Sequence, residues 1–221
     1  MKKFYLLAIV MVGILFSGCE QNQMETKHKG HEFVDLGLSV KWATCNVGAT
    51  TPEEYGNYFA WGDVVPQNTD VMYKWGAEEG ELTKYCTKSE NGIVDGKTTL
   101  DKADDAAAVH WGGKWRMPTK AEMAELMNEC TWQWTSQNRV IGYTVTGPNG
   151  KSIFLPAAGA AHGDFYDSAG ELGLYWSNTL IAQDNETCAY GLCLTSDYVD
   201  WSWEGSSAWR GIAQSVRPVC P

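Results

Sequence analysis

From Trp132 onward the chain consists of short apolar stretches separated by turn residues, and this pattern restricts the fold more than any other feature. Val140–Thr146 and Ser152–Leu155 flank Gly147–Gly150, a segment of Gly, Pro and Asn that is typical of a hairpin turn. Further strand-like stretches follow at Tyr175–Ser177, Ala189–Thr195, Tyr198–Trp203 and Ser215–Val219. The second half of the chain therefore predicts a meander of antiparallel strands.

Two helices are expected before this meander. Leu100–His110 is rich in Ala and Asp and is followed by Gly112-Gly113, which favours a helix with a left-handed C-terminal cap. We expect its paired acids, Asp104 and Asp105, to be solvated on an exposed helix face. The clearer helix begins after Thr119, which stands at capping-box spacing from Glu122. Its apolar residues recur at helical spacing and predict a core face: Met123, Leu126, Met127 and Cys130.

The N-terminal part predicts short strands and a long irregular segment. Phe33–Ala43 is expected to form two strands around a glycine turn, and Tyr58–Trp61 is another short apolar stretch. Residues 62–97 are rich in loop-forming residues. No internal repeat and no linker is evident after residue 31. The pattern as a whole predicts one α+β domain with two helices and a twisted antiparallel sheet.

Composition and charge exclude several classes of protein. The chain has 44% hydrophobic and 20% charged residues, as in an ordinary globular protein. The formal net charge is -10, and no cluster of Lys and Arg exists beyond Lys2-Lys3. A nucleic-acid-binding surface needs clustered cations to displace counterions, so we expect no nucleic-acid partner.

The first residues form a targeting segment. Lys2 and Lys3 precede the apolar stretch Phe4–Phe16, which is too short to span a membrane. Leu15–Cys19 resembles a bacterial lipobox, which implies cleavage before Cys19 and lipidation of its sulfur. The alternative is an ordinary secretory signal in which Cys19 is incidental. We therefore expect a signal peptide over residues 1–18, a flexible tether over 19–31 and a folded domain over 32–221.

These expectations predict where in the cell the protein is located. A lipid anchor at Cys19 would hold the protein in the cell envelope, on the outer rather than the inner bacterial membrane, facing either way. The acidic domain is repelled by anionic lipid head groups, so the membrane contact is expected through the anchor alone. The domain itself is expected to be a monomer.

The cysteines agree with export to an oxidising compartment. Six follow Cys19, which permits up to three disulfides in 15 possible sets of pairs. No Cys-x-x-Cys is present, and the histidines are scattered, so we expect no structural metal. We expect no cofactor either.

Four segments together carry a family resemblance: Val34–Ala49, Gly113–Thr119, Phe154–Gly159 and Ser215–Cys220. In this order they resemble the Fibrobacter succinogenes major paralogous domain group, which is abundant in exported proteins and lipoproteins of the Bacteroidetes. The resemblance covers roughly residues 32–221. It implies a C-type-lectin-like fold, of the branch that includes formylglycine-generating enzymes and phage tropism determinants, and a ligand-binding role. In some members a retroelement diversifies the C-terminal strands.

The segments also suggest what lies inside the domain. Trp42, Trp115 and Trp176 are expected in the core. In Gly113–Thr119 we expect a buried Trp, a helix cap and an Arg salt bridge rather than an anion site. At least one disulfide is expected among the cysteines in or beside these segments, namely Cys45, Cys86, Cys130 and Cys220.

The resemblance leaves an enzymatic alternative open. Formylglycine-generating enzymes bind copper through two cysteines five residues apart, a spacing matched by Cys188 and Cys193. The flanking residues differ, because Leu194–Asp197 replaces the basic stretch of those enzymes. The residues of the calcium-dependent sugar site of true C-type lectins are absent, although a structural calcium remains open. A copper-type oxidase and a purely structural envelope subunit are the alternatives to a binding module.

We place the expected binding function on the late strands. Tyr198–Arg210 contains aromatic, acidic and Arg side chains, which offer large contact areas and charge-assisted hydrogen bonds. We expect this face to bind a protein or glycan, with Trp201 and Trp203 either as anchors or as core residues. The expected ligand contacts are Tyr198, Asp200, Trp201, Trp203, Glu204, Trp209 and Arg210, together with Asp164, Tyr166 and Asn178 from neighbouring loops.

Overall fold

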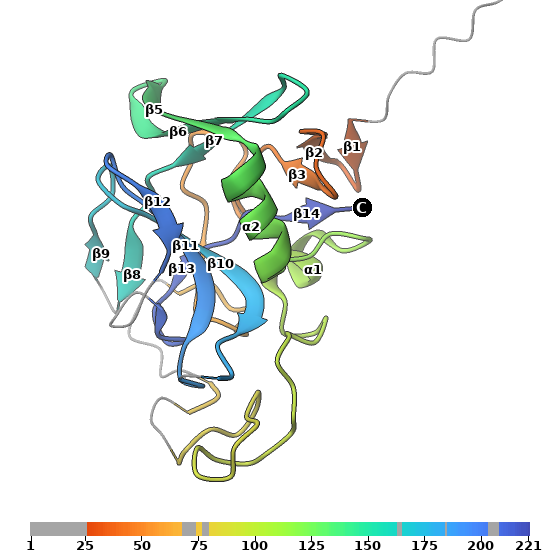
Figure 1. Cartoon of the computed structure of the whole chain (residues 1–221), viewed down its shortest axis with the longest axis vertical. Helices are drawn as coiled ribbons and strands as arrows, with labels where there is room; N and C mark the ends of the chain where they lie inside the picture. Colours follow the sequence, from red (N-terminus) through yellow and green to blue (C-terminus); the bar gives the residue numbers. More distant parts are fainter. Residues whose placement is uncertain (1–25, 68–73, 77–79, 163–164, 184, 203–207) are drawn as a thin grey trace, which may run out of the picture.

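The computed structural model describes residues 26–67, 74–76, 80–162, 165–183, 185–202 and 208–221. Two helices and short strands make up these residues, with the helices in the middle of the chain (Figure 1). The expected α+β composition is therefore confirmed. The described strands form four small sheets rather than one.

A five-stranded sheet lies at the centre of the molecule. Its strand order is β12 (Val199–Trp201), β11 (Ala189–Leu194), β10 (Gly173–Leu180), β13 (Gln214–Ser215) and β4 (Tyr58–Phe59). All its pairs are antiparallel except β10 with β13, which is parallel. Strand β10 is buried along nearly its whole length, so both faces of the sheet are covered.

A second sheet joins the two ends of the described chain. It has the order β1 (Lys27–His28), β2 (His31–Val34), β3 (Lys41–Ala43) and β14 (Val219–Cys220). The expected hairpin around the glycine turn is present as β2 and β3, with Phe33 opposite Ala43. Residues 27–31 of the expected tether take part in this sheet, because β1 pairs with β2 and the His31 ring stacks on Trp111 at a centroid distance of 3.8 Å.

The predicted hairpin after the second helix is also present. A three-stranded sheet contains β5 (Thr131–Gln137), β6 (Val140–Thr146) and β7 (Ser152–Pro156), with β6 and β7 joined as the Gly147–Gly150 turn indicates. A two-stranded sheet follows, formed by β8 (Ala160–His162) and β9 (Phe165–Asp167).

Helix α2 (Lys120–Glu129) has the structure that its sequence predicts. The Thr119 hydroxyl accepts from the Glu122 backbone N–H at 3.2 Å, and the Glu122 carboxylate accepts from the Thr119 N–H at 2.8 Å. Arg116 pairs with Glu122, and Trp115 is buried, so the expected cap, salt bridge and buried Trp are all found. The helix packs on β10 and β11, with Met123 and Leu126 in the core (Figure 1).

Helix α1 (Ala106–Trp111) is shorter than expected, and the prediction of solvated acids before it is wrong. Asp105 is the N-cap and accepts from the backbone N–H groups of Ala108 and Met117 at 2.9 Å. Burial raises its pKa, and Asp104 beside it is also buried. An Asp at a helix start satisfies exposed N–H groups, which stops the helix from extending back toward Leu100.

The core contains the three tryptophans that the sequence placed there, since Trp42, Trp115 and Trp176 are all almost fully buried. They belong to three different clusters of buried side chains, which explains why the protein needs several large aromatic residues in separate places. Neither of the two helices in the described residues is long and apolar enough to cross a membrane.

The expected disulfide is not formed in this structure. All six cysteines from Cys45 to Cys220 are thiols. They lie in separate surroundings: Cys86 donates to the Lys88 carbonyl at 3.1 Å, Cys130 caps α2, and Cys220 packs beside Trp115. Sequence position beside the family-like segments therefore did not bring two sulfur atoms within bonding distance.

Candidate functional site

Several residues of the expected ligand face cannot be assigned a place. Trp203, Glu204, Asp164 and the lipidation candidate Cys19 lie outside the described residues. Tyr166 belongs to β9, where it pairs with Ala161, and its side chain is likewise outside the description. The structure therefore bears on six of the expected contacts: Asn178, Tyr198, Asp200, Trp201, Trp209 and Arg210.

Arg210 is not an exposed ligand contact, which corrects the prediction. Its side chain is fully buried beneath the long irregular segment. The guanidinium donates to the carbonyls of Tyr85 at 3.0 Å, Glu186 at 2.7 Å and Lys84 at 2.9 Å, and it lies 5.1 Å from the Trp61 ring. A buried cation must be matched by acceptors, and these carbonyls supply them. Arg210 thus supports the fold.

Asn178 and Trp209 also serve the framework. Asn178 is buried in β10, where its backbone N–H donates to Pro118 at 2.8 Å and its carbonyl accepts from Leu100 at 3.0 Å. Trp209 is half-buried, forms a bridge with Cys188, and has its ring against Gly211, where an added Cβ would lie 2.5 Å away.

The remaining three residues lie in or next to β12, the edge strand of the central sheet: Tyr198 directly precedes the strand, Asp200 and Trp201 belong to it, and the pleat separates them. Val199 and Trp201 pack against the largest buried cluster, as the alternation of the sequence predicts. Tyr198 and Asp200 point to the other side, where Cys193 is directly opposite Asp200 and its thiol lies 3.9 Å from the Tyr198 hydroxyl. Tyr198 is 53% exposed, whereas Cys193 is buried. This burial raises the pKa of the Cys193 thiol.

On the α2 side of the sheet, Trp201 forms part of a surface that the sequence did not predict. The rings of Tyr190 and Trp201 are 5.7 Å apart in an edge-to-face arrangement. The Lys120 ammonium lies 3.7 Å from the Tyr190 ring centroid and 5.9 Å from that of Trp201. All three side chains are half-buried. We call these three residues the Lys120 platform.

Lys120 occupies an unusual position for a cation. It is the first residue of α2, where the helix dipole disfavours positive charge. The rings of Tyr190 and Trp201 compensate, because their faces attract a cation. The only local sequence feature that pointed to this surface is the Lys at the first position of the helix. The packing of α2 on β11 then brings its ammonium to the Tyr190 ring.

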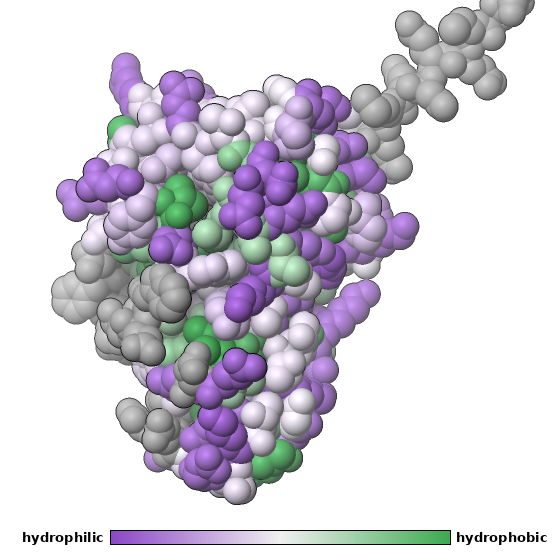
Figure 2. Space-filling view, viewed as in Figure 1, coloured by the Kyte–Doolittle hydropathy of each residue, from purple (hydrophilic) through white to green (hydrophobic). Residues whose placement is uncertain are grey.

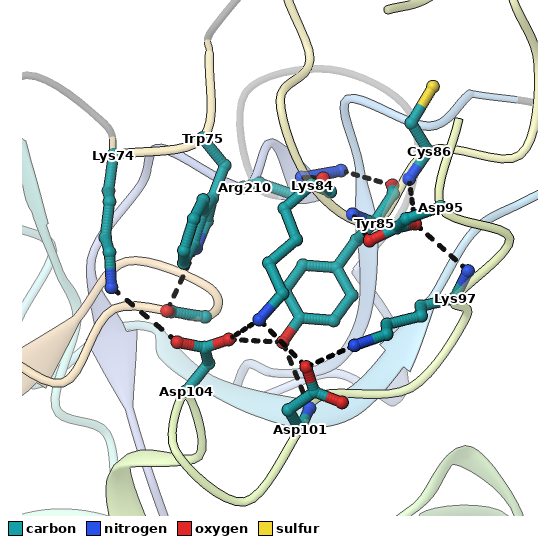
Figure 3. A network of polar contacts seen from close by, with 11 residues as sticks. Lys74, Trp75, Lys84, Tyr85, Cys86, Asp95, Lys97, Asp101, Asp104 and Arg210 are labelled. Atoms are coloured by element: carbon teal, nitrogen blue, oxygen red, sulfur yellow. Dashed lines mark hydrogen bonds and ion pairs between the residues drawn. The ribbon is translucent and has the colours of Figure 1, made fainter. Parts of the chain in front are cut away.

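A polar network occupies the irregular segment before α1. Figure 3 shows the Lys84 ammonium between two carboxylates, Asp101 at 2.8 Å and Asp104, which also accepts from the Tyr85 hydroxyl at 2.6 Å. Burial raises the pKa of Asp104, but the hydrogen bonds from Lys84 and Tyr85 outweigh it and the pKa falls below its usual value. Burial alone would lower the pKa of Lys84, yet its two carboxylate partners raise it.

Further contacts fix the same segment. Asp95 accepts from the backbone N–H groups of Tyr85 and Cys86 at 2.9 and 3.1 Å (Figure 3). Buried Glu186 accepts from the Thr87 N–H at 2.7 Å and from the Asn91 amide at 2.7 Å. These bonds join the segment to itself and to the central sheet. The network therefore stabilises a chain without regular structure, and sequence spacing gave no signal for it.

The arrangement of Cys188 and Cys193 does not resemble a two-cysteine metal site. Cys188 precedes β11 and Cys193 lies within it, so an extended strand separates them by about 16 Å and turns them to opposite faces. In the part of the chain that the structure describes, no group of three His, Cys, Asp or Glu residues could hold a metal ion.

Exposed apolar side chains are few and dispersed. Figure 2 shows small apolar patches among mostly hydrophilic residues on the viewed face. The large hydrophobic residues that are exposed in the described chain are Val65, Ile93, Val94, Val109 and Tyr198. Comparison with known proteins adds no assignment, since no family model, no curated protein and no solved structure matches the chain.

Proposed function

We propose that the mature chain is a non-catalytic binding module of the bacterial cell envelope, anchored through a lipid on Cys19. The proposal includes a C-type-lectin-like fold of the Fibrobacter succinogenes major paralogous domain group. The lipobox-like sequence, the four ordered segments and the pairing of β3 near the N-terminus with β14 at the C-terminus support it. The ligand is a protein or glycan.

The observation that carries the binding proposal is the Lys120 platform. Half-buried Trp and Tyr rings provide a large contact area at a small cost in side-chain entropy. The ammonium beside them can pair with an acidic group while an apolar face of the ligand covers Trp201. A ligand of this kind carries a carboxylate next to an apolar surface, as acidic sugars and acidic peptides do.

The test is a binding screen of the mature chain against immobilised glycans and envelope proteins, followed by titration of the ligand with variants. Trp201→Ala should weaken binding about 30-fold, since a central aromatic anchor contributes about 2 kcal/mol or more. Lys120→Met keeps the apolar stem but removes the charge, and it should weaken binding of an acidic ligand at low salt.

Tyr198→Ala is the matched control, because Tyr198 directly precedes the same strand and its hydroxyl lies beside Cys193, on the side opposite Trp201. It should bind as the wild type does. If Trp201→Ala and Lys120→Met both bind normally, the platform is not the contact surface. A loss confined to Tyr198→Ala would move the contact to the side of β12 that carries Asp200.

A further inference from the structure

A hollow lies beside β4, at the other edge of the central sheet. The sheet order puts β4 at the edge opposite β12, so this hollow is distinct from the Lys120 platform. It has a volume of about 340 Å³ and is open to solvent. The lining residues come from three separate segments: Tyr55, Gly56, Asn57, Tyr58, Pro66, Gln67 and Ala169.

One wall of the hollow is held by a fully buried arginine. Arg217 donates from Nε to the Asn46 side-chain oxygen at 2.8 Å, and the Asn46 amide donates to the Tyr55 carbonyl at 2.9 Å. Arg217 also donates to three backbone carbonyls, those of Ala43, Thr44 and Phe154. The core thereby fixes the backbone at Tyr55.

Two glycines set the position of Asn57. Gly56 has a φ of +74°, and an added Cβ would lie 2.4 Å from the Val47 carbonyl oxygen. At Gly48, with a φ of +84°, an added Cβ would lie 2.5 Å from the Asn57 side-chain amide. Only glycine allows both close approaches. The Asn57 N–H also donates to the Val47 carbonyl at 2.8 Å, so this residue is fixed before any ligand binds.

The opposite wall is equally well fixed. The Gln67 backbone N–H donates to the Tyr58 carbonyl at 2.7 Å, and its amide lies 3.4 Å from buried Asp63. Tyr58 is a buried lining residue whose hydroxyl donates to the Ala158 carbonyl at 2.5 Å, which fixes its ring. Hydrogen bonds to the framework therefore set the orientation of both walls.

The chemistry of the lining selects a class of ligand. None of the lining residues carries a charged side chain at neutral pH, so the hollow offers no ion pair to an acid or an amine. Asn57 and Gln67 each provide a donor and an acceptor, and Tyr55 and Tyr58 provide aromatic surface. Neighbouring hydroxyl groups on an apolar ring match this combination, and the volume falls in the range of small-molecule sites.

We propose that this hollow binds a single uncharged sugar residue, either free or at the end of a glycan. The Tyr rings face the C–H groups of the sugar, and the two amides bind its hydroxyl groups. The inference does not depend on the Lys120 platform, because it uses other residues at the other edge of the sheet.

The experiment is saturation-transfer NMR on the mature chain with a panel of methyl glycosides of glucose, galactose, mannose and N-acetylglucosamine. Glucuronate and glucosamine serve as charged counterparts of the same size. At least one neutral glycoside should receive saturation with a dissociation constant in the millimolar range, and the charged sugars should bind at least about fivefold more weakly because their charges lose solvation without a partner.

Variants assign the binding to the hollow. Asn57→Ala and Gln67→Ala should each weaken binding about five- to tenfold, since each removes hydrogen bonds to sugar hydroxyls. Gly48→Ala should weaken binding by displacing the Asn57 amide, although it replaces none of the lining residues themselves. Trp201→Ala should bind the sugar normally, which separates this site from the platform. Melting curves identify any variant that fails to fold, and Gln67→Ala and Asn57→Ala lie on separate segments, so one failure leaves the other informative.

Three results would overturn the proposal. The first is that no neutral glycoside receives saturation. The second is that glucuronate or glucosamine binds as well as the neutral sugars. The third is that folded Asn57→Ala and Gln67→Ala both bind normally, or that Trp201→Ala alone abolishes binding.

Discussion

Arg210 is a single side chain on which the arrangement of the irregular segment depends. Its three backbone acceptors belong to Lys84, Tyr85 and Glu186. Arg210→Ala should lower the free energy of unfolding by about 3 kcal/mol or more, because three buried carbonyls lose their donors. This corresponds to a fall in melting temperature of about 6–12 °C.

Arg210→Lys is the control, since it keeps the charge but lacks the planar guanidinium whose two terminal nitrogens reach the three carbonyls. It should melt between the wild type and Arg210→Ala. If Arg210→Ala has the melting temperature of the wild type, the guanidinium does not stabilise the irregular segment.

Asp104 makes stability depend on pH. Burial raises its pKa, but hydrogen bonds from Lys84 and Tyr85 outweigh this and hold the folded pKa below the usual 3.8. A carboxyl with a lowered folded pKa stabilises the protein above its unfolded pKa, and this contribution is lost as the pH falls through the folded pKa. Urea unfolding at about pH 6 and about pH 3 should show a smaller loss in Asp104→Asn than in the wild type. Equal losses in the two proteins would contradict this role.

At the scale of elements, one close backbone contact holds the irregular segment together. Leu82 and Gly92 form a parallel bridge, and a Cβ added at Gly92 would lie 2.1 Å from the Leu82 carbonyl oxygen. Gly92→Ala should therefore force the backbones at residues 82 and 92 apart. We expect tryptic cleavage after Lys84 and Lys88 to become about tenfold faster, since local opening controls proteolysis.

Gly96→Ala is the matched control for this substitution. Gly96 also has a positive φ, of +68°, but nothing lies within 4 Å of an added Cβ. Both glycines have a positive φ that disfavours Ala, +152° at Gly92 and +68° at Gly96, and only Gly92→Ala adds the clash. If both are cleaved at the same rate, the Leu82 contact does not hold the segment.

Elements specified by nearby residues were predictable from the sequence. The capping box of Thr119 and Glu122 and the hairpin at Gly147–Gly150 depend on residues a few positions apart, so their patterns were sufficient. The length of helix α1 was overestimated, because Ala favours the helix interior whereas Asp favours the N-cap, and the sequence contains both. Asp105 is the N-cap in the structure, where it also accepts from the backbone N–H of Met117, a residue outside the helix. The pairing of Lys84 with Asp104 spans a loop that has no periodicity to interpret.

The candidate sites could not be predicted from short sequence patterns, because each combines residues that are far apart along the chain. Alternation along β12 correctly separated Trp201 from Tyr198, but the aromatic sequence also suggested an exposed Arg210, which is buried. Lys120 reaches Tyr190 only because α2 packs on the central sheet. The hollow beside β4 combines Tyr55, Gln67 and Ala169, which no spacing rule connects.

The thiols provide a test of the molecule as a whole. In the unfolded mature chain without reductant, iodoacetamide should label all six cysteines from Cys45 to Cys220, since the structure holds them as thiols. In the native protein, labelling should be slow at neutral pH. Burial raises the pKa of the Cys86 thiol and, with Glu125 and Glu129 nearby, raises that of Cys130 to about 11. Intact-mass spectra lacking two labels after unfolding would instead indicate a disulfide.

The proposed anchor determines how the molecule stands on its membrane. The first described strand starts at Lys27, and even a fully extended chain from Cys19 to that residue would reach at most about 28 Å. A lipid on Cys19 would thus keep the sheet that contains β1 close to the membrane, and the irregular segment before α1 lies at the far end of the molecule (Figure 1).

Metabolic labelling with an alkyne-palmitate tests the anchor. The label should mark the wild type. Cys19→Ala should lose the label and leave the membrane fraction, because stable attachment to a membrane needs acyl chains and this variant has lost the residue that carries them. Cys45→Ala, which alters a cysteine inside the domain, should keep both the label and the membrane association. Label that persists in Cys19→Ala would place the acyl chains on another residue and refute the anchor.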